Sequence, residues 1–176
     1  MNKKIQRNYL EINSIKELNE SKVATEGYSV QLIEPADFQL NKFFYKNVGK
    51  KHHWVDRLVW DDNQWNKYAS EKKVKTYTLS KNKDLAGYFE LILHLNEKEV
   101  EIAYLGLLEE YQNQKLGSYL LSSAIKKSFL EKIKRSRQLL PVIILISSVI
   151  GSIYTGIATA TEAASLGVVG ALLLSF

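Results

Sequence analysis

The strongest constraint on this chain is the point at which its charges stop. All 24 lysines and arginines lie at or before Arg137, and 18 of the 19 acidic residues lie in the same part of the chain. The 38 residues from Leu139 to Phe176 carry one charge, on Glu162. A charged sequence of ordinary length folds around a core in water, whereas about 20 apolar residues suffice to cross a bilayer. The sequence therefore predicts two segments that prefer different solvents.

The apolar segment 139–176 is too long for one straight transmembrane helix. At 1.5 Å per residue such a helix would be about 57 Å long, whereas the hydrocarbon layer of a membrane is about 30 Å thick. Gly151, Gly156 and the polar stretch 159–162 are therefore the expected breaks. The first 20 residues of the segment suffice for one transmembrane helix. Six basic residues between 126 and 137 precede it, which predicts that residues 1–137 lie on the cytoplasmic side of a membrane. The same six residues also fit the solvated end of the preceding helix, and if the tail is an artefact the expected location is cytoplasmic.

The charged part of the chain has the pattern of an α/β domain. Alternating apolar residues predict strands, and apolar residues at helical spacing predict helices. The predicted elements are, in order, a strand at 9–12, a helix capped by Ser14 with Glu17, a strand at 28–34, helices at 36–48 and 61–73, strands at 74–80, 85–96 and 98–111, and a helix at 115–133. The short connection at 96–99 predicts antiparallel pairing of the last two strands. The order indicates a mixed sheet with helices packed against it.

Composition excludes several kinds of site. The chain has no cysteine, which rules out disulfides and thiolate metal sites. His52 and His53 are adjacent, and adjacent histidines on a loop lack the separated ligands that zinc requires, so no metal site is expected. The basic residues are dispersed among acidic ones, which indicates a solvated surface and no nucleic-acid partner.

A candidate anion site lies in the stretch 105–121, where the last predicted strand meets the last helix. The apolar strand ends, a short turn follows, and the helix begins near residues 115–117. The free backbone N–H groups at a helix start, together with the helix dipole, bind phosphate oxygens. The sequence therefore favours a phosphate-bearing ligand at this turn.

The same turn resembles the acetyl-coenzyme A motif of the GNAT acetyltransferases, Arg/Gln-x-x-Gly-x-Gly/Ala. Gln112 matches its first position and Gly117 its last. Lys115 stands where the middle glycine is usual, and Asn113 takes another position that glycine often holds. The departure at Lys115 puts close backbone contact in question there, although its ammonium group could assist a phosphate.

The resemblance extends beyond this motif. The aromatic segment 43–65, with its order His-Trp-x-Asp-Arg, is similar to that of a bacterial GNAT subgroup, and the whole resemblance covers about residues 9–131. It implies an N-acyltransferase that uses acetyl-CoA as co-substrate, with the pantetheine along Leu105 and Leu107. It places the pyrophosphate on backbone N–H groups of Gln112, Asn113, Gln114, Lys115, Leu116, Gly117 and Ser118. It places His53, Trp54, Asp56 and Arg57 on the acceptor side.

In that family the amine attacks the thioester directly, and a carboxylate acting through water often takes its proton. Glu90 and Glu101, on adjacent predicted strands, are the candidates for this base. Strand alternation predicts Glu90 on a face with Tyr88 and His94, and Glu101 opposite Ile102 and Tyr104. Both glutamates also fit the simpler interpretation of solvent-facing strand carboxylates.

The apolar tail carries a second resemblance. Residues 156–164 are similar to the Gly-Ile-x-Thr-Pro-Thr-Glu-Ala-Ala segment of the large membrane subunit of TRAP transporters, with Ala160 in place of the proline. This resemblance covers about residues 138–176 and implies a membrane segment with a small TRAP subunit as partner. A lone carboxylate such as Glu162 is costly in a membrane unless it is paired or lines a polar cavity.

Both resemblances stop near the same point. GNAT domains continue after the motif helix with further strands, for which residues from Gln138 onward offer no candidate. We therefore expect a truncated GNAT domain at 1–133, a basic junction at 134–138 and a TRAP-like transmembrane segment at 139–176, joined from two unrelated gene fragments. An acetyltransferase impaired by truncation, a transporter fragment and a non-catalytic remnant all remain open.

Overall fold

The computed structural model describes residues 9–21, 26–94, 96–97, 99–138 and 140–174. Leu95 and Lys98, in and beside the predicted turn, and Leu139, at the start of the predicted tail, lie outside these residues. The chain divides into two compact units, residues 1–130 and 131–176, and each is described by itself. We call them the sheet unit and the tail unit.

The sheet unit is built on four strands that lie side by side in chain order. They are β1 (Tyr28–Leu32), β2 (Val74–Lys81), β3 (Asp84–His94) and β4 (Glu99–Leu107). Two helices, α1 (Phe38–Gly49) and α2 (Asp62–Ala69), connect β1 to β2. Because one helix carries the chain across the sheet and the other carries it back, β2 starts at the end where β1 finishes. The strands β2, β3 and β4 follow one another through short turns. All pairings among the described strands are antiparallel, and the predicted mixed sheet is wrong.

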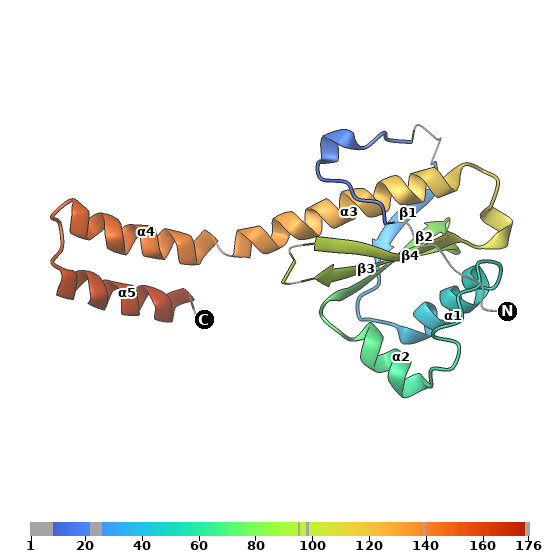
Figure 1. Cartoon of the computed structure of the whole chain (residues 1–176), viewed down its shortest axis with the longest axis horizontal. Coiled ribbons are helices and arrows are strands. Elements are labelled where there is room, and N and C mark those ends of the chain that lie inside the picture. The colour runs from blue at the N-terminus through green and yellow to red at the C-terminus, as the bar shows by residue number, and fades with distance from the viewer. Residues whose placement is uncertain (1–8, 22–25, 95, 98, 139, 175–176) are drawn as a thin grey trace. The chain divides into compact units, whose positions relative to one another are not determined.

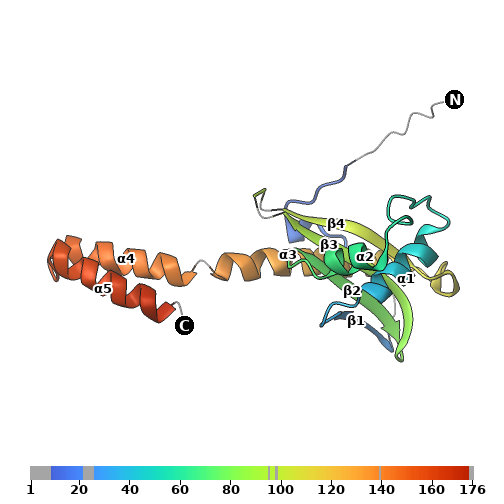
Figure 2. The ribbon, with the colours of Figure 1, turned by 90° about the horizontal axis from the view of Figure 1, so that it is seen from below.

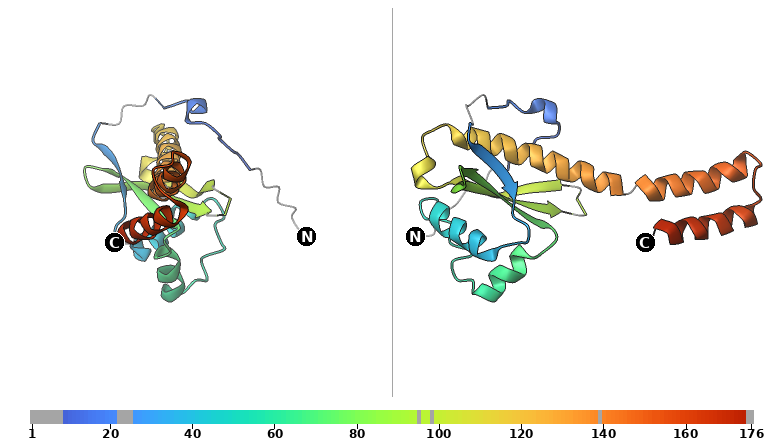
Figure 3. Two further views of the ribbon diagram at one scale, coloured as in Figure 1. Left: turned by 90° about the vertical axis from the view of Figure 1, so that its left-hand side faces the viewer. Right: turned by 180° about the vertical axis from the view of Figure 1, so that it is seen from behind.

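Helices cover both faces of this sheet. The part of helix α3 (Leu116–Gln138) that belongs to the sheet unit lies over one face, while α1 and α2 lie under the other, as Figure 1 and the right-hand view of Figure 3 show. Phe89 and Leu91 of β3 pack under α3 with Leu120, whereas Tyr88, the residue before Phe89, points to the other face and packs with Phe44 of α1. The alternation of β3 thus builds two apolar layers, one on each face.

Local signals predicted most element boundaries. The helix α2 begins with a capping box in which Asp61 accepts from the N–H of Gln64 while the Gln64 side chain accepts from the N–H of Asp61. The turn between β2 and β3 is formed by Asn82 and Lys83, both with positive φ, which suits a tight hairpin. The last predicted strand, however, ends at Leu107, and a 3-10 turn at Glu109–Tyr111 follows.

The N-terminal predictions fail. Residues 9–12 form no strand, and Tyr9 and Leu10 are 85% and 99% exposed, because no strand lies beside them to accept their hydrogen bonds. The helix expected after Ser14 is a single 3-10 turn, Ile15–Glu17, in which Ser14 accepts from the N–H of Lys16. A good cap does not sustain a helix without an apolar face to bury.

A β-bulge changes which face the β4 residues occupy. Glu90 pairs with Tyr104 but Leu91 pairs with Ile102, so Ala103 is an extra residue in β4. Ile102 therefore packs on the α3 face and Tyr104 on the α1 face. The prediction that these two residues share a face is wrong, because an inserted residue shifts alternation by one.

The tail unit contains the last turns of α3 and two apolar helices, α4 (Leu140–Tyr154) and α5 (Ala160–Leu174). The helices run side by side in Figures 1 and 2. The predicted break at Gly156 is confirmed, since this glycine adopts a φ of 71°, whereas Gly151 lies inside α4. Judged by length and composition alone, one helical stretch of the described residues, Leu116–Tyr154, is long and apolar enough to cross a membrane.

Candidate functional site

The loop between β4 and α3 has the backbone shape of a glycine-rich turn without the glycines. Asn113 and Lys115 have φ values of 61° and 58°. These are the two positions where the resemblance leads us to expect glycine, the residue that adopts positive φ at least cost. For lysine this conformation costs roughly 1–2 kcal/mol. The loop therefore keeps its shape although its residue types differ.

Gly117, in the first turn of α3, faces open space. A Cβ atom built on it would meet no protein atom within 4 Å. Gly106 of β4 is the opposite case, because a Cβ there would lie 2.2 Å from Val48 Cγ1. Packing of the chain itself therefore requires glycine at 106 but not at 117.

The polar side chains of this loop are directed back onto its own backbone. Gln112 Nε2 donates to Leu107 O at 3.2 Å, and Gln114 Nε2 donates to Glu110 O at 3.0 Å. Ser118 Oγ donates to Lys115 O at 2.8 Å. These bonds brace the turn, and the first N–H groups of α3 are those that a helix leaves without an internal partner.

The predicted apolar contacts of the pantetheine lie beside this turn. Leu107 and Leu116 are buried in the layer between α3 and the sheet, and Leu105 packs against that layer. The end of β4 and the start of α3 are thus fixed to each other by apolar packing. The structure brings together the whole predicted set from Leu105 to Ser118.

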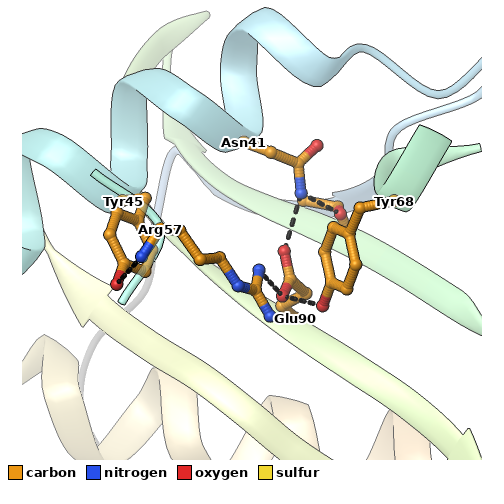
Figure 4. A network of polar contacts seen from close by, with 6 residues as sticks. Asn41, Tyr45, Arg57, Tyr68 and Glu90 are labelled. Atoms are coloured by element: carbon orange, nitrogen blue, oxygen red, sulfur yellow. Dashed lines mark hydrogen bonds and ion pairs between the residues drawn. The ribbon is translucent and has the colours of Figure 1, made fainter. Parts of the chain in front are cut away.

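Glu90 is the centre of a buried polar network on the opposite face of the sheet (Figure 4). The residue is 1% exposed, and its carboxylate accepts from Asn41 Nδ2 at 2.7 Å, Arg57 Nη1 at 3.0 Å and Tyr68 Oη at 2.5 Å. Asn41 Nδ2 also donates to Thr76 Oγ1 at 2.7 Å. A buried carboxylate requires such partners, and three donors from three separate segments satisfy this one.

Arg57 is the counter-ion of Glu90 and is buried with it. Its guanidinium lies within 6 Å of the ring centroids of Tyr45, Trp60, Trp65, Tyr68 and Tyr104. Burial by itself lowers the pKa of Arg57, but the negative charge of Glu90 helps to raise this pKa above its ordinary value. Tyr45 Oη accepts from the N–H of Arg57 at 3.1 Å, which holds the backbone of the loop in place.

The tyrosines around this network are held neutral. Burial raises the pKa of Tyr68 above its ordinary value, and the negative charge of Glu90 raises it further. The same two causes, in the same order, raise the pKa of Tyr88. Neutral Tyr68 can therefore keep donating its hydroxyl proton to Glu90 at high pH.

The second predicted base, Glu101, has a different environment. Its side chain is 54% exposed, and Oε2 lies 2.8 Å from Nε2 of His94 on the neighbouring strand. Glu101 pairs with Ile92 of β3 and lies two residues before the bulge at Ala103. One candidate carboxylate is therefore buried and saturated with donors, and the other is open to solvent.

The four residues predicted to line the acceptor side do not share one environment. His53 and Asp56 are exposed, and His53 has a φ of 54°. Trp54 is half-buried, with its ring 4.7 Å from that of Tyr104 in an edge-on contact. Arg57 points into the interior toward Glu90, so it does not line an open surface, because its charge is satisfied there.

Sequence reasoning missed Asn41, Tyr45 and Tyr68, although a signal for Asn41 was present. Asn41 lies on the same helical stripe as Phe44, Tyr45 and Val48, which are all buried. A polar residue on an apolar stripe must find a partner in the core. Its partner is 49 positions away in the chain, so spacing alone could not identify it.

Among the described residues, no group of three or more histidines, cysteines, aspartates or glutamates could hold a metal ion.

Comparison with known proteins gives one family match. Residues 37–140 match the model of the acetyltransferase (GNAT) family, whereas the resemblance noted in the sequence covered residues 9–131. A search of curated proteins gave no match.

Two solved structures are similar over part of the chain. The ribosomal-protein-S18-alanine N-acetyltransferase from Escherichia coli is 19% identical with a TM-score of 0.43, and the alignment covers 61% of each chain. A conserved protein of unknown function from Staphylococcus epidermidis is 17% identical with a TM-score of 0.39, and covers 62% of this chain and 40% of its own. The chain thus spans less than two thirds of either protein's length.

Proposed function

The chain belongs to the GNAT acetyltransferase family, since the matched residues make up more than half of it, and on this premise we propose that it transfers an acetyl group from acetyl-CoA to an amine. The observation that carries this proposal is the turn before α3. Its backbone has positive φ at Asn113 and Lys115, and the helix start beyond it faces open space at Gly117.

In this proposal the pyrophosphate of acetyl-CoA accepts from N–H groups at the start of α3. The helix dipole and the free N–H groups favour an anion there. The missing Cβ of Gly117 lets phosphate oxygens approach the backbone, and the ammonium of Lys115 adds a positive charge. The pantetheine follows the end of β4 beside Leu105 and Leu107, where an N–H group near Leu107 polarises the thioester carbonyl.

Glu101 is the better candidate for the base. A general base must reach water or substrate and must have a free lone pair, and Glu101 is exposed with His94 as its contact. Glu90 accepts from three donors and neutralises the buried Arg57, so protonating it would leave that charge uncompensated. We therefore assign Glu90 to fixing the aromatic loop and Glu101 to accepting the proton through water.

The proposed reaction balances without a further reactant. The amine nitrogen attacks the thioester carbonyl carbon, and a C–N bond forms as the carbonyl oxygen becomes an oxyanion. Glu101 takes the amine proton through water. Collapse of the intermediate breaks the C–S bond, and the coenzyme A thiolate takes up a proton from solvent, which leaves an amide and free coenzyme A.

The test is acetyl-CoA binding to the full chain by isothermal titration, with Gly117→Ala as the variant. Alanine at 117 meets no protein atom, so folding is unaffected, while its Cβ intrudes on the phosphate; we expect affinity to fall at least tenfold. Gly151→Ala is the matched control, because Gly151 also lies in a helix with no atom near its Cβ position. Equal binding by the two variants would contradict the proposed site, and no binding by the natural chain would contradict the function.

The tail supports a membrane location as part of this proposal. Its helices α4 and α5 are apolar and their large side chains are exposed, and basic residues precede them. We place residues 139–176 in a bilayer, with residues 1–137 on the cytoplasmic face. Sedimentation of the expressed chain with the membrane fraction, and its release only by detergent, would support this location; recovery in the supernatant would contradict it.

A TRAP transporter fragment is the alternative function for the tail. The observation in its favour is that the helix break falls inside the resembling segment, between Tyr154 and Ala160. This alternative predicts that a small TRAP subunit co-purifies with the chain from detergent, and a preparation free of that subunit would count against it.

A further inference from the structure

We propose that α4 and α5 enter the bilayer together as a helical hairpin, so that both ends of the tail unit face the same side of the membrane. The inference rests on the proposed membrane location and goes beyond it. A single spanning helix would instead leave the end of the chain on the opposite side from Ser136.

The two helices pack through small residues. Ala163 of α5 is fully buried, and a Cβ on Gly170 would lie 2.2 Å from Leu145 Cδ1 of α4. A Cβ on Gly167 would lie 3.4 Å from Val149 Cγ2. Close approach of backbones over small residues is how helices associate in lipid, where apolar side chains gain nothing by avoiding the solvent.

The large apolar side chains of this hairpin point outward. Most of them are exposed, among them Ile143, Ile144 and Ile146 of α4 and Leu166, Val168 and Val169 of α5, whereas Leu145 and Val149 face the glycines of α5. A helical hairpin that folds in water turns its large apolar side chains inward and its small or polar ones outward. This arrangement is reversed, and it fits hydrocarbon as the surrounding medium.

Six polar side chains of the hairpin form hydrogen bonds within it, as a hydrocarbon surrounding favours. Ser148, Ser152 and Ser165 each donate to the carbonyl three residues earlier, at 2.7–2.8 Å, and Thr155 donates to Gly151 O at 2.8 Å. The one carboxylate, on Glu162, accepts from both the N–H and the hydroxyl of Thr159 at 2.8 Å. It therefore caps the start of α5.

The length of α5 and the turn before it support one-sided insertion. The helix α5 has 15 residues and is about 22 Å long, which is shorter than the roughly 30 Å hydrocarbon layer, so α5 alone does not cross that layer. The positive φ of Gly156 turns the chain back after α4. Lys134 and Arg135 hold the entry end among the headgroups, and the packing of α5 on α4 returns the other end to the same side.

Because the chain has no cysteine, single cysteines report this topology without interference. In the full chain expressed in bacterial cells, Ser136→Cys marks the entry end and Ser175→Cys the far end. With a membrane-impermeant maleimide, we expect both to label at least tenfold faster in inside-out vesicles than in intact cells. Labelling of Ser175→Cys mainly in intact cells would overturn the hairpin and leave the membrane location standing, whereas recovery of the chain in the supernatant would overturn both.

A pair of cysteines tests the packing directly. Leu145→Cys with Gly170→Cys should form a disulfide within one chain in the membrane, seen as a mobility shift that reductant reverses. Leu145→Cys with Leu172→Cys is the control, because Leu172 is 58% exposed and this pair leaves Gly170 unchanged. Equal cross-linking of both pairs, or a disulfide between two chains as the main product, would overturn the hairpin.

Discussion

The two units of this protein place their apolar side chains in opposite ways. In the sheet unit, the large apolar residues of β2 and β3 are buried, and its buried charges, Glu90 and Arg57, neutralise each other. In the described part of the tail unit, Ala163 is the one apolar side chain that is fully buried. The sheet unit therefore carries its own core, whereas the tail unit needs an apolar surrounding.

Glu90→Ala should destabilise the sheet unit by about 3–5 kcal/mol, because it leaves the buried charge of Arg57 without a partner. This is a large part of the 5–15 kcal/mol that stabilises an ordinary domain. Urea unfolding of the full chain can be followed by tryptophan fluorescence, since Trp54, Trp60 and Trp65 all lie in the sheet unit.

Glu101→Ala is the matched control for this prediction. It removes a carboxylate from the adjacent strand, but that carboxylate is exposed, so stability should change by less than about 1 kcal/mol. If Glu101 is the base, this variant instead lowers the rate of acetyl transfer. Equal destabilisation by the two variants would show that burial of Glu90 does not distinguish them.

Ile144→Lys tests the tail unit in the same way. In a helix exposed to water this change would be nearly neutral, but at the centre of a membrane helix a lysine costs about 2.5–3.5 kcal/mol. We expect the variant to shift from the membrane fraction toward the supernatant. The tryptophan-monitored unfolding of the sheet unit should stay as it was, and an unchanged distribution between fractions would speak against a bilayer around Ile144.

Alkaline pH should weaken the sheet unit. The pKa values of Tyr68 and Tyr88 are raised in the folded state, above an ordinary value of 10. Their contribution is therefore complete below pH 10 and is lost as the pH rises further, since unfolding releases their protons. Each tyrosine should lower the free energy of unfolding by about 1.4 kcal/mol per pH unit above 10.

Urea unfolding at pH 9, 10 and 11 measures this effect. Tyr68→Phe removes one titrating group and should make the loss between pH 10 and 11 smaller. A variant that loses stability as steeply as the natural chain would show that Tyr68 ionises freely in the folded state.

Lys115→Gly should have a small effect on stability, of opposite sign to that of Glu90→Ala. Glycine relieves the strain of a positive φ, which would stabilise the fold by about 1 kcal/mol. If the ammonium contacts phosphate, the same variant binds acetyl-CoA several-fold more weakly. Titration and urea unfolding of one sample separate the two effects, and tighter binding by the variant would remove Lys115 from the site.

Much of the architecture was predictable because its signals are local. The capping box at Asp61, the turn at Asn82 and the break at Gly156 each depend on residues within a few positions of one another. The loop of the candidate site was located in the same way, from a strand end, a short turn and Gly117. Residue types and spacing carry this information before any tertiary contact forms.

The sequence by itself determined where the chain changes solvent, because the end of its charges near Arg137 is a matter of composition. Only the tertiary structure decided that Glu90 binds Arg57, 33 positions away, and that the bulge at Ala103 separates Ile102 from Tyr104. Buried partners and strand register depend on how distant segments meet. That is the physical reason why two glutamates on adjacent strands, alike in the sequence, proved so different in the fold.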